Sequence, residues 1–102
     1  MPTIQWVQDT AITSATAYAV PAKALGLPTE AYLVGVQGAT IAPLGNGTAA
    51  STAAPILETG QVATASAAGQ ISLDESTQEL TSGDTIPADS LVTVFVTIAG
   101  RD

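Results

Sequence analysis

The chain has 102 residues, nine of them acidic and two basic, and its formal net charge at pH 7 is −7. It contains neither cysteine nor histidine, which excludes disulfides, thiolate metal sites and catalysis by imidazole. Nucleic-acid binding is not expected, because Lys23 and Arg101 are the only side chains able to displace counterions from phosphates. The length fits one domain, residues 1–102, with a single modest core.

Charged residues make up only 11% of the chain, whereas about 25% is usual in a soluble domain. Such a chain either lies in a membrane or has much of its surface covered by neighbouring subunits. The most apolar run, residues 91–99, is shorter than the about 20 residues that a membrane-spanning helix needs. No positively charged segment followed by an apolar one opens the chain, so a secretory signal is not expected. We therefore expect an assembly subunit that does not enter a membrane.

The first thirty residues carry strand signals with one exception. Residues 3–8 and 12–20 are rich in β-branched and aromatic side chains, and turn-forming residues follow each run. The exception is residues 22–26, which are predicted to form one helical turn that begins after Pro21 and ends at Gly26.

Two glycines interrupt the next apolar stretch. Residues 31–37 and 39–42 are predicted to be strands, and Gly35 and Gly38 predict a bulge, a bend or a tight turn between them. Residues 45–55 are low in complexity and have little to bury, so we interpret them as a long loop.

The second half of the chain continues with short strand signals, of which the last is the clearest. In residues 91–99, Val92, Val94, Val96 and Ile98 share one face and alternate with Leu91, Thr93, Phe95 and Thr97. Both faces of this strand carry β-branched or aromatic side chains, which predicts a central position in a sheet. Short strands without crossover helices predict an all-β fold, an antiparallel β-sandwich or small jelly-roll-like barrel with at most one short helical turn.

One acidic segment, residues 74–89, is the candidate for chemistry. Its members are Asp74, Glu75, Glu79, Asp84 and Asp89. A glycoside hydrolase needs a carboxylate pair in an aromatic-lined cleft, but only 4% of the residues are aromatic. We interpret the segment as a solvated loop that keeps the chain soluble, with cation binding as an open alternative that lacks a recognised calcium-loop pattern. No catalytic residue, metal ligand or cofactor is predicted.

The aromatic residues suggest a surface for protein contacts. A sugar-binding platform is one interpretation, and a core or interface position is the favoured one because the aromatics are scattered over several strands. Residues 1–10 are predicted to be a strand or arm that anchors to a neighbouring subunit, so deleting them is expected to weaken assembly more than folding. The candidate interface residues are Ile4, Trp6, Val7, Tyr18 and Tyr32.

In residues 12–21 ("ITSATAYAVP"), 60–73 and 91–100, the chain resembles the small virion proteins of tailed bacteriophages, most of all the capsid decoration (cement) proteins. The resemblance implies a β-domain on the capsid surface that binds the major capsid protein, forms a homo-oligomer with a trimer favoured, and bridges neighbouring subunits to stabilise the head. It implies no contact with nucleic acid or membrane.

Two alternatives remain open. One is another phage component from the tail, the turret or the head–tail joint. The other is a carbohydrate-binding or adhesion module. An enzyme is not expected, because no base is available to activate a serine and no carboxylate pair is evident.

Overall fold

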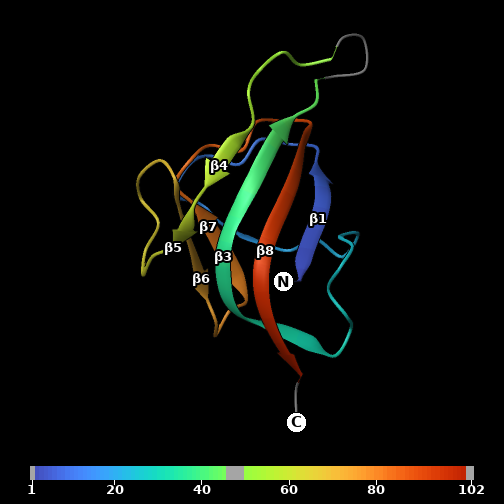
Figure 1. Cartoon of the computed structure of the whole chain (residues 1–102), viewed down its shortest axis with the longest axis vertical. Coiled ribbons are helices and arrows are strands. Elements are labelled where there is room, and N and C mark those ends of the chain that lie inside the picture. The colour runs from blue at the N-terminus through green and yellow to red at the C-terminus, as the bar shows by residue number, and fades with distance from the viewer. Residues whose placement is uncertain (1, 46–49, 101–102) are drawn as a thin grey trace.

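The computed structural model describes residues 2–45 and 50–100, which form eight strands in two four-stranded sheets (Figure 1). Within these ranges there is no helix, and hence none long and apolar enough to cross a membrane. The prediction of an all-β sandwich is confirmed. Sheet 1 has the order β1 (Thr3–Gln8), β8 (Ser90–Gly100), β3 (Ala31–Pro43), β4 (Ile56–Glu58). Sheet 2 has the order β2 (Ala17–Ala19), β7 (Glu79–Ser82), β6 (Gln70–Asp74), β5 (Gly60–Gln61). Neighbouring strands are antiparallel except β5 and β6, which are parallel.

Strand β8 lies between β1 and β3, as its two apolar faces predict. Val92, Val94 and Val96 are fully buried between the sheets, while Leu91 and Phe95 on the opposite face are half-buried. Alternation at a period of two residues produces this division. The buried valines join Ile4, Ile41, Ile71 and Leu80 in one hydrophobic core that both sheets share.

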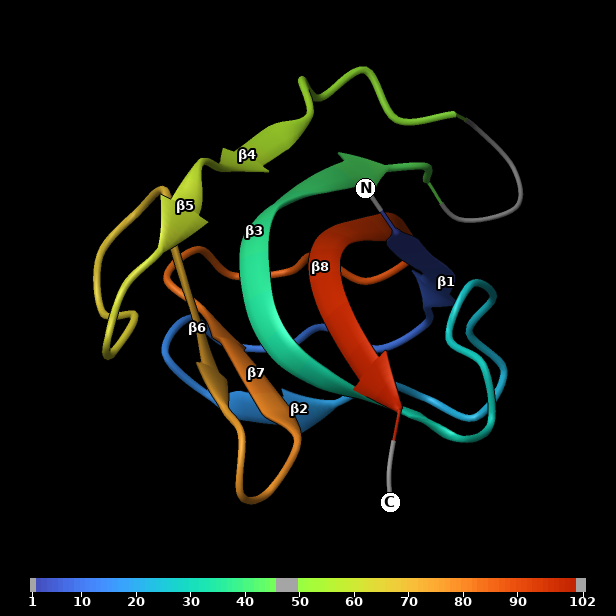
Figure 2. The same ribbon diagram turned by 60° about the horizontal axis from the view of Figure 1, so that its bottom comes forward.

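The prediction of two strands over residues 31–42 is wrong, because β3 is a single strand of 13 residues. The glycines mark the predicted bulges, since its register with β8 shifts between Leu33 and Gly35 and again between Val36 and Gly38. Each bulge adds a residue that bends the strand, and Figure 2 shows β3 and β8 strongly curved. At the two glycines the chain therefore bends within a single strand and does not form a turn between two strands.

Residues 22–26 form a turn and a bridge and not the predicted helical turn. The amide of Ala24 donates to the carbonyl oxygen of Pro21 at 3.0 Å, which closes a tight turn. Leu25 then pairs with Gln5 of β1 through two backbone hydrogen bonds of 3.0 and 2.9 Å. The strand expected at residues 12–20 is reduced to β2, because Ala15 has a left-handed backbone with φ of 61°.

The acidic segment of residues 74–89 is not one loop, because it contains β7. The turn between β6 and β7 is built on Asp74, whose Oδ1 accepts hydrogen bonds from the Ser76 amide at 3.0 Å and the Ser76 hydroxyl at 2.7 Å. These bonds to the ionised form lower the pKa of Asp74. Residues 74–77 before β7 form an exposed turn, whereas the part after β7 includes fully buried Ile86.

Residues 46–49 of the expected loop at 45–55 lie outside the described residues. On either side of them Gly45 pairs with Ala50, and residues 51–55 form no strand. At the N-terminus, β1 pairs with β8 over residues 3–8. Of the two alternatives predicted for this segment, a strand or an arm, residues 3–8 therefore form a strand of sheet 1.

Candidate functional site

The side of sheet 1 that faces away from sheet 2 carries only uncharged side chains. Strand alternation and cross-strand register place ten residues there, which we call the outer sheet face. They are Thr3, Gln5, Val7, Thr40, Ala42, Leu57, Leu91, Thr93, Phe95 and Thr97. In Figure 1 this face is turned toward the viewer and no strand crosses it.

One row of residues runs across the whole outer sheet face and ends in a leucine on each side. Leu57 lies opposite Thr40, Thr40 opposite Thr93, and Thr93 opposite Gln5. Gln5 in turn lies opposite Leu25, which extends the row beyond β1. Leu57 is 57% exposed and Leu25 is 73% exposed. Four strand spacings of about 4.8 Å separate the two leucines, so they lie about 19 Å apart.

A shallow groove accompanies the Leu25 end of this row. Its lining includes Val7, which is 38% exposed, and the side chain of Leu91 from β8. Lys23 borders the groove and forms an ion pair with Asp9 at 3.3 Å. Both partners are largely exposed, so this pair contributes little to stability. The groove is therefore an apolar surface with one charge at its rim.

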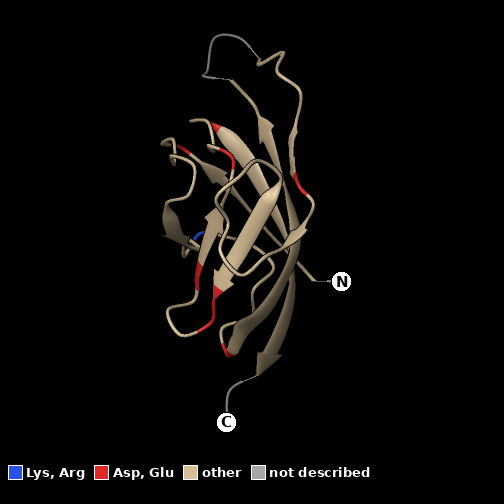
Figure 3. Cartoon of the chain, turned by 90° about the vertical axis from the view of Figure 1, so that its left-hand side faces the viewer, with Lys and Arg blue, Asp and Glu red and all other residues tan. Residues whose placement is uncertain are grey.

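The acidic side chains lie elsewhere. In Figure 3, which shows sheet 1 edge-on at the right, the acidic segments gather mainly on the other side of the molecule. Asp74, Glu75, Glu79 and Asp84 belong to sheet 2 or to its turns, whereas Asp9 and Asp89 flank strands of sheet 1. A partner of the outer sheet face thus needs no positive charge.

Side chains and a loop cover parts of the edges of sheet 1, where an extra strand could otherwise pair. At the edge of β3, the Gln78 side chain accepts from the Leu33 amide at 2.7 Å and donates to the Leu33 carbonyl at 2.9 Å. The side-chain Oε1 of Gln61 accepts from the Val36 amide at 3.0 Å. The edge of β1 is covered at Gln5 by Leu25. Covered edges oppose the addition of strands at these positions.

The five candidate interface residues fall into two groups. Ile4 is fully buried, and Trp6 and Tyr18 are 4% and 8% exposed, so these three side chains pack inside the chain. Val7 lies on the outer sheet face, and half-buried Tyr32 lies opposite Ala99 at the lower end of the same sheet. The structure therefore does not bring the five residues together on one surface.

Leu25 and Leu57 were missed by sequence reasoning. Each lies in a short segment with another large apolar residue close by, Ile56 beside Leu57 and Leu27 near Leu25, so no periodic pattern distinguishes it from a core leucine. Their exposure follows from a register that joins segments far apart in the chain.

A second unexpected residue is Glu58, which is only 2% exposed. Its Oε1 accepts a hydrogen bond from the Asp84 amide at 3.2 Å, whereas Oε2 has no hydrogen-bond partner among the described residues. Burial raises the pKa of Glu58 from 4.5 to about 7, the hydrogen bond from Asp84 opposes this, and the Asp84 carboxylate adds to it. Glu58 lies outside the acidic segment in sequence, so it was not a candidate for chemistry.

A buried hydroxyl pair lies nearby on sheet 2. The Tyr18 hydroxyl is 2.7 Å from Ser82 Oγ, and burial raises the pKa of Tyr18 to about 12. This phenol stays protonated at neutral pH, so it serves as a hydrogen-bonding group and not as a base. In the described part of the chain, no group of three or more acidic residues is placed to hold a metal ion.

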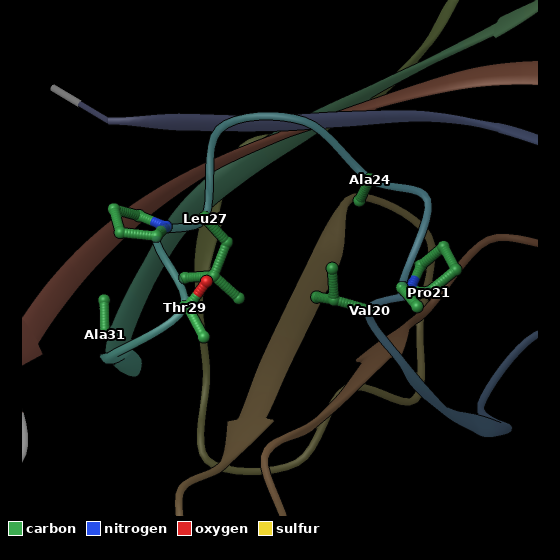
Figure 4. Close-up of a pocket in the computed structure, with 8 residues that line it drawn as sticks. Val20, Pro21, Ala24, Leu27, Thr29 and Ala31 are labelled. Carbon is green, nitrogen blue, oxygen red and sulfur yellow. The ribbon is translucent and has the colours of Figure 1, made fainter.

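Figure 4 shows an apolar hollow beside the loop that follows β2. It contains no ionisable side chain, and Thr29 supplies its one side-chain hydroxyl. Its lining residues are Val20, Pro21, Ala22, Ala24, Leu27, Pro28, Thr29 and Ala31. No acidic or basic side chain lines the hollow to activate that hydroxyl.

No protein-family model, no curated protein and no solved structure matches this chain. The fold and the surface are therefore described by their own geometry, as an acidic β-sandwich with an uncharged outer sheet face.

Proposed function

We propose that the chain is a non-enzymatic structural protein of a virion, a capsid decoration protein that stabilises a phage head by bridging neighbouring subunits of the major capsid protein. The observation that carries the proposal is the row across the outer sheet face, with exposed Leu57 at one end and exposed Leu25 at the other. The resemblance of the sequence to decoration proteins supplies the kind of assembly.

The two leucines favour a bridging role because each can contact a different neighbour. Burying a leucine side chain completely stabilises by about 1.5–3 kcal/mol. Leu25 and Leu57 are 73% and 57% exposed in the isolated chain, so a partner that buries them would gain much of this stabilisation. A separation of about 19 Å lets the two ends of the row rest on two adjacent protein surfaces.

The charge distribution supports the same role. An uncharged partner surface can cover the outer sheet face without desolvating any carboxylate. The acidic side chains of sheet 2 would then remain in water, and the net charge of −7 gives no attraction to packaged nucleic acid.

The carbohydrate-binding alternative receives less support. A sugar platform needs exposed aromatic faces, but Trp6 and Tyr18 are buried against one another in the core. A tail, turret or head–tail joining protein would use the same kind of surface, and its position in the particle separates it from a decoration protein.

The test is binding to phage heads assembled from the capsid protein of the genome that encodes this chain. We expect the wild-type chain to sediment with heads and to raise their melting temperature. Leu25→Glu and Leu57→Glu should each weaken binding, and the double variant should abolish it, because each places a charge in an apolar contact. Ala17→Glu, on exposed β2 of sheet 2, is the matched control and should bind like the wild type.

Electron microscopy of the loaded heads locates the chain and separates capsid decoration from the joint or tail. The proposal is wrong if the wild type does not bind heads, or if the double leucine variant binds as well as Ala17→Glu.

A further inference from the structure

Glu58 occupies the position where the chain crosses between the two sheets. It is the last residue of β4 in sheet 1, and β5 of sheet 2 begins at Gly60. Three residue pairs join β4 to β3, and two join β5 to β6. The crossover is therefore held by few backbone pairs, so the contacts of the Glu58 side chain weigh heavily in keeping it in place.

The groups around the Glu58 carboxyl are poorly suited to a negative charge. From the turn after β7, the Asp84 amide donates one hydrogen bond at 3.2 Å, and the Asp84 side chain brings a second carboxylate. That carboxylate is itself held by the Gly69 amide at 2.9 Å. From sheet 2, the phenol of Tyr18 interacts electrostatically with Glu58, whose negative charge contributes to the raised pKa of Tyr18.

The remaining neighbours carry no charge. On β3, Ala39 pairs with Glu58 and Gly38 packs against its carbonyl oxygen. Lys23 forms its ion pair with Asp9. An ionised Glu58 would thus be buried with backbone amides of Asp84 and Gly69 as its only stabilising contacts, beside the Asp84 carboxylate and without a positive partner among these neighbours.

We infer that the Glu58 carboxyl is a proton-operated latch, which holds the crossover from β4 to β5 closed while it is neutral and loosens it on ionisation. This inference does not rest on the proposed function, since it concerns the opening of the isolated chain.

The direction of the pH dependence follows from linkage. The pKa of Glu58 is raised from 4.5 to about 7 in the folded chain. A carboxyl that binds its proton more tightly when closed contributes full stability below pH 4.5, loses it as the pH rises toward 7, and levels off above 7. Between pH 5 and pH 8 the opening constant of the latch should rise roughly 70-fold.

Hydrogen exchange of the whole chain at pH 5 and pH 8 tests the latch. Protection factors, corrected for the intrinsic effect of pH, are compared for the amides of β4 and of Thr59, which donates to the Gly69 carbonyl. In the wild type we expect them to fall by tens-fold from pH 5 to pH 8. Glu58→Gln keeps the shape and removes the ionisation, so its protection should stay constant. Glu75→Gln, at an exposed turn, should behave like the wild type.

A second measurement covers the case in which Glu58→Gln does not fold. Carboxyl carbon NMR on wild-type chain labelled at glutamate follows only four side chains, those of Glu30, Glu58, Glu75 and Glu79. One of them should titrate near neutral pH. The inference is overturned if all four titrate below pH 5.5, or if wild-type protection of β4 is the same at pH 5 and pH 8.

Discussion

The indole ring of Trp6 lies against the phenol ring of Tyr18, with ring centroids 6.3 Å apart and planes inclined by 59°. Trp6 comes from β1 of sheet 1 and Tyr18 from β2 of sheet 2, so this tilted aromatic pair connects the two layers. Inclined rings at this separation attract beyond simple burial. Both residues were candidates for contact with a neighbour, and both instead pack in the core of the chain.

Replacing Trp6 tests this placement. Trp6→Ala removes a buried aromatic side chain and leaves a cavity, so we expect the free energy of unfolding to fall by about 3–5 kcal/mol. Val7→Ala, at the exposed neighbouring position of the same strand, should cost far less. Urea denaturation followed by circular dichroism measures both. Equal losses would contradict the placement of Trp6 between the sheets.

The same placement changes the expected effect of deleting residues 1–10. The deletion removes β1 together with buried Ile4 and Trp6. We therefore expect loss of the folded state, and not the selective loss of assembly that an exposed arm would show.

Two glycines provide a matched pair for backbone packing. A Cβ on Gly38 would stand 2.5 Å from the carbonyl oxygen of Glu58, whereas one on Gly60 would meet nothing within 4 Å. Gly38→Ala should therefore destabilise the chain by more than about 1 kcal/mol, because β3 and β4 must move apart. Gly60→Ala should be neutral or slightly stabilising, since it restricts the unfolded chain. Thermal unfolding compares the two, and a Gly38→Ala variant as stable as Gly60→Ala would rule out the close contact.

The covered edge of β3 leads to a prediction about self-association. Gln78→Ala removes the two hydrogen bonds to the backbone of Leu33. We expect both lower stability and slow aggregation at high concentration, because the freed amide and carbonyl can pair with another chain. Gln37→Ala, which removes an exposed bond from Gln37 Nε2 to Thr97 Oγ1, is the control. Light scattering over days measures aggregation, and equal behaviour of the two variants would show that Gln78 does not protect the edge.

Much of the fold could be predicted from local pattern. The alternation in β8 indicated a central strand, and the glycines of β3 indicated irregular pairing. Other elements could not be found in this way. Strand β7 has four residues and is flanked by acidic turns, so its local composition is that of a loop. Leu25 was predicted to lie in a helical turn, because a proline such as Pro21 is typical of the start of a helix and a glycine such as Gly26 of its end.

By itself, the sequence determined an all-β chain without imidazole or thiol chemistry, because composition and alternation are properties of neighbouring residues. Only the tertiary structure decided which side chains share a surface or a buried space. The row from Leu57 to Leu25 depends on the register of five segments that are distant in the chain. Glu58 became a candidate only when Asp84, 26 residues away, met it between the sheets. Register and burial arise from packing the whole chain, and no local pattern contains them.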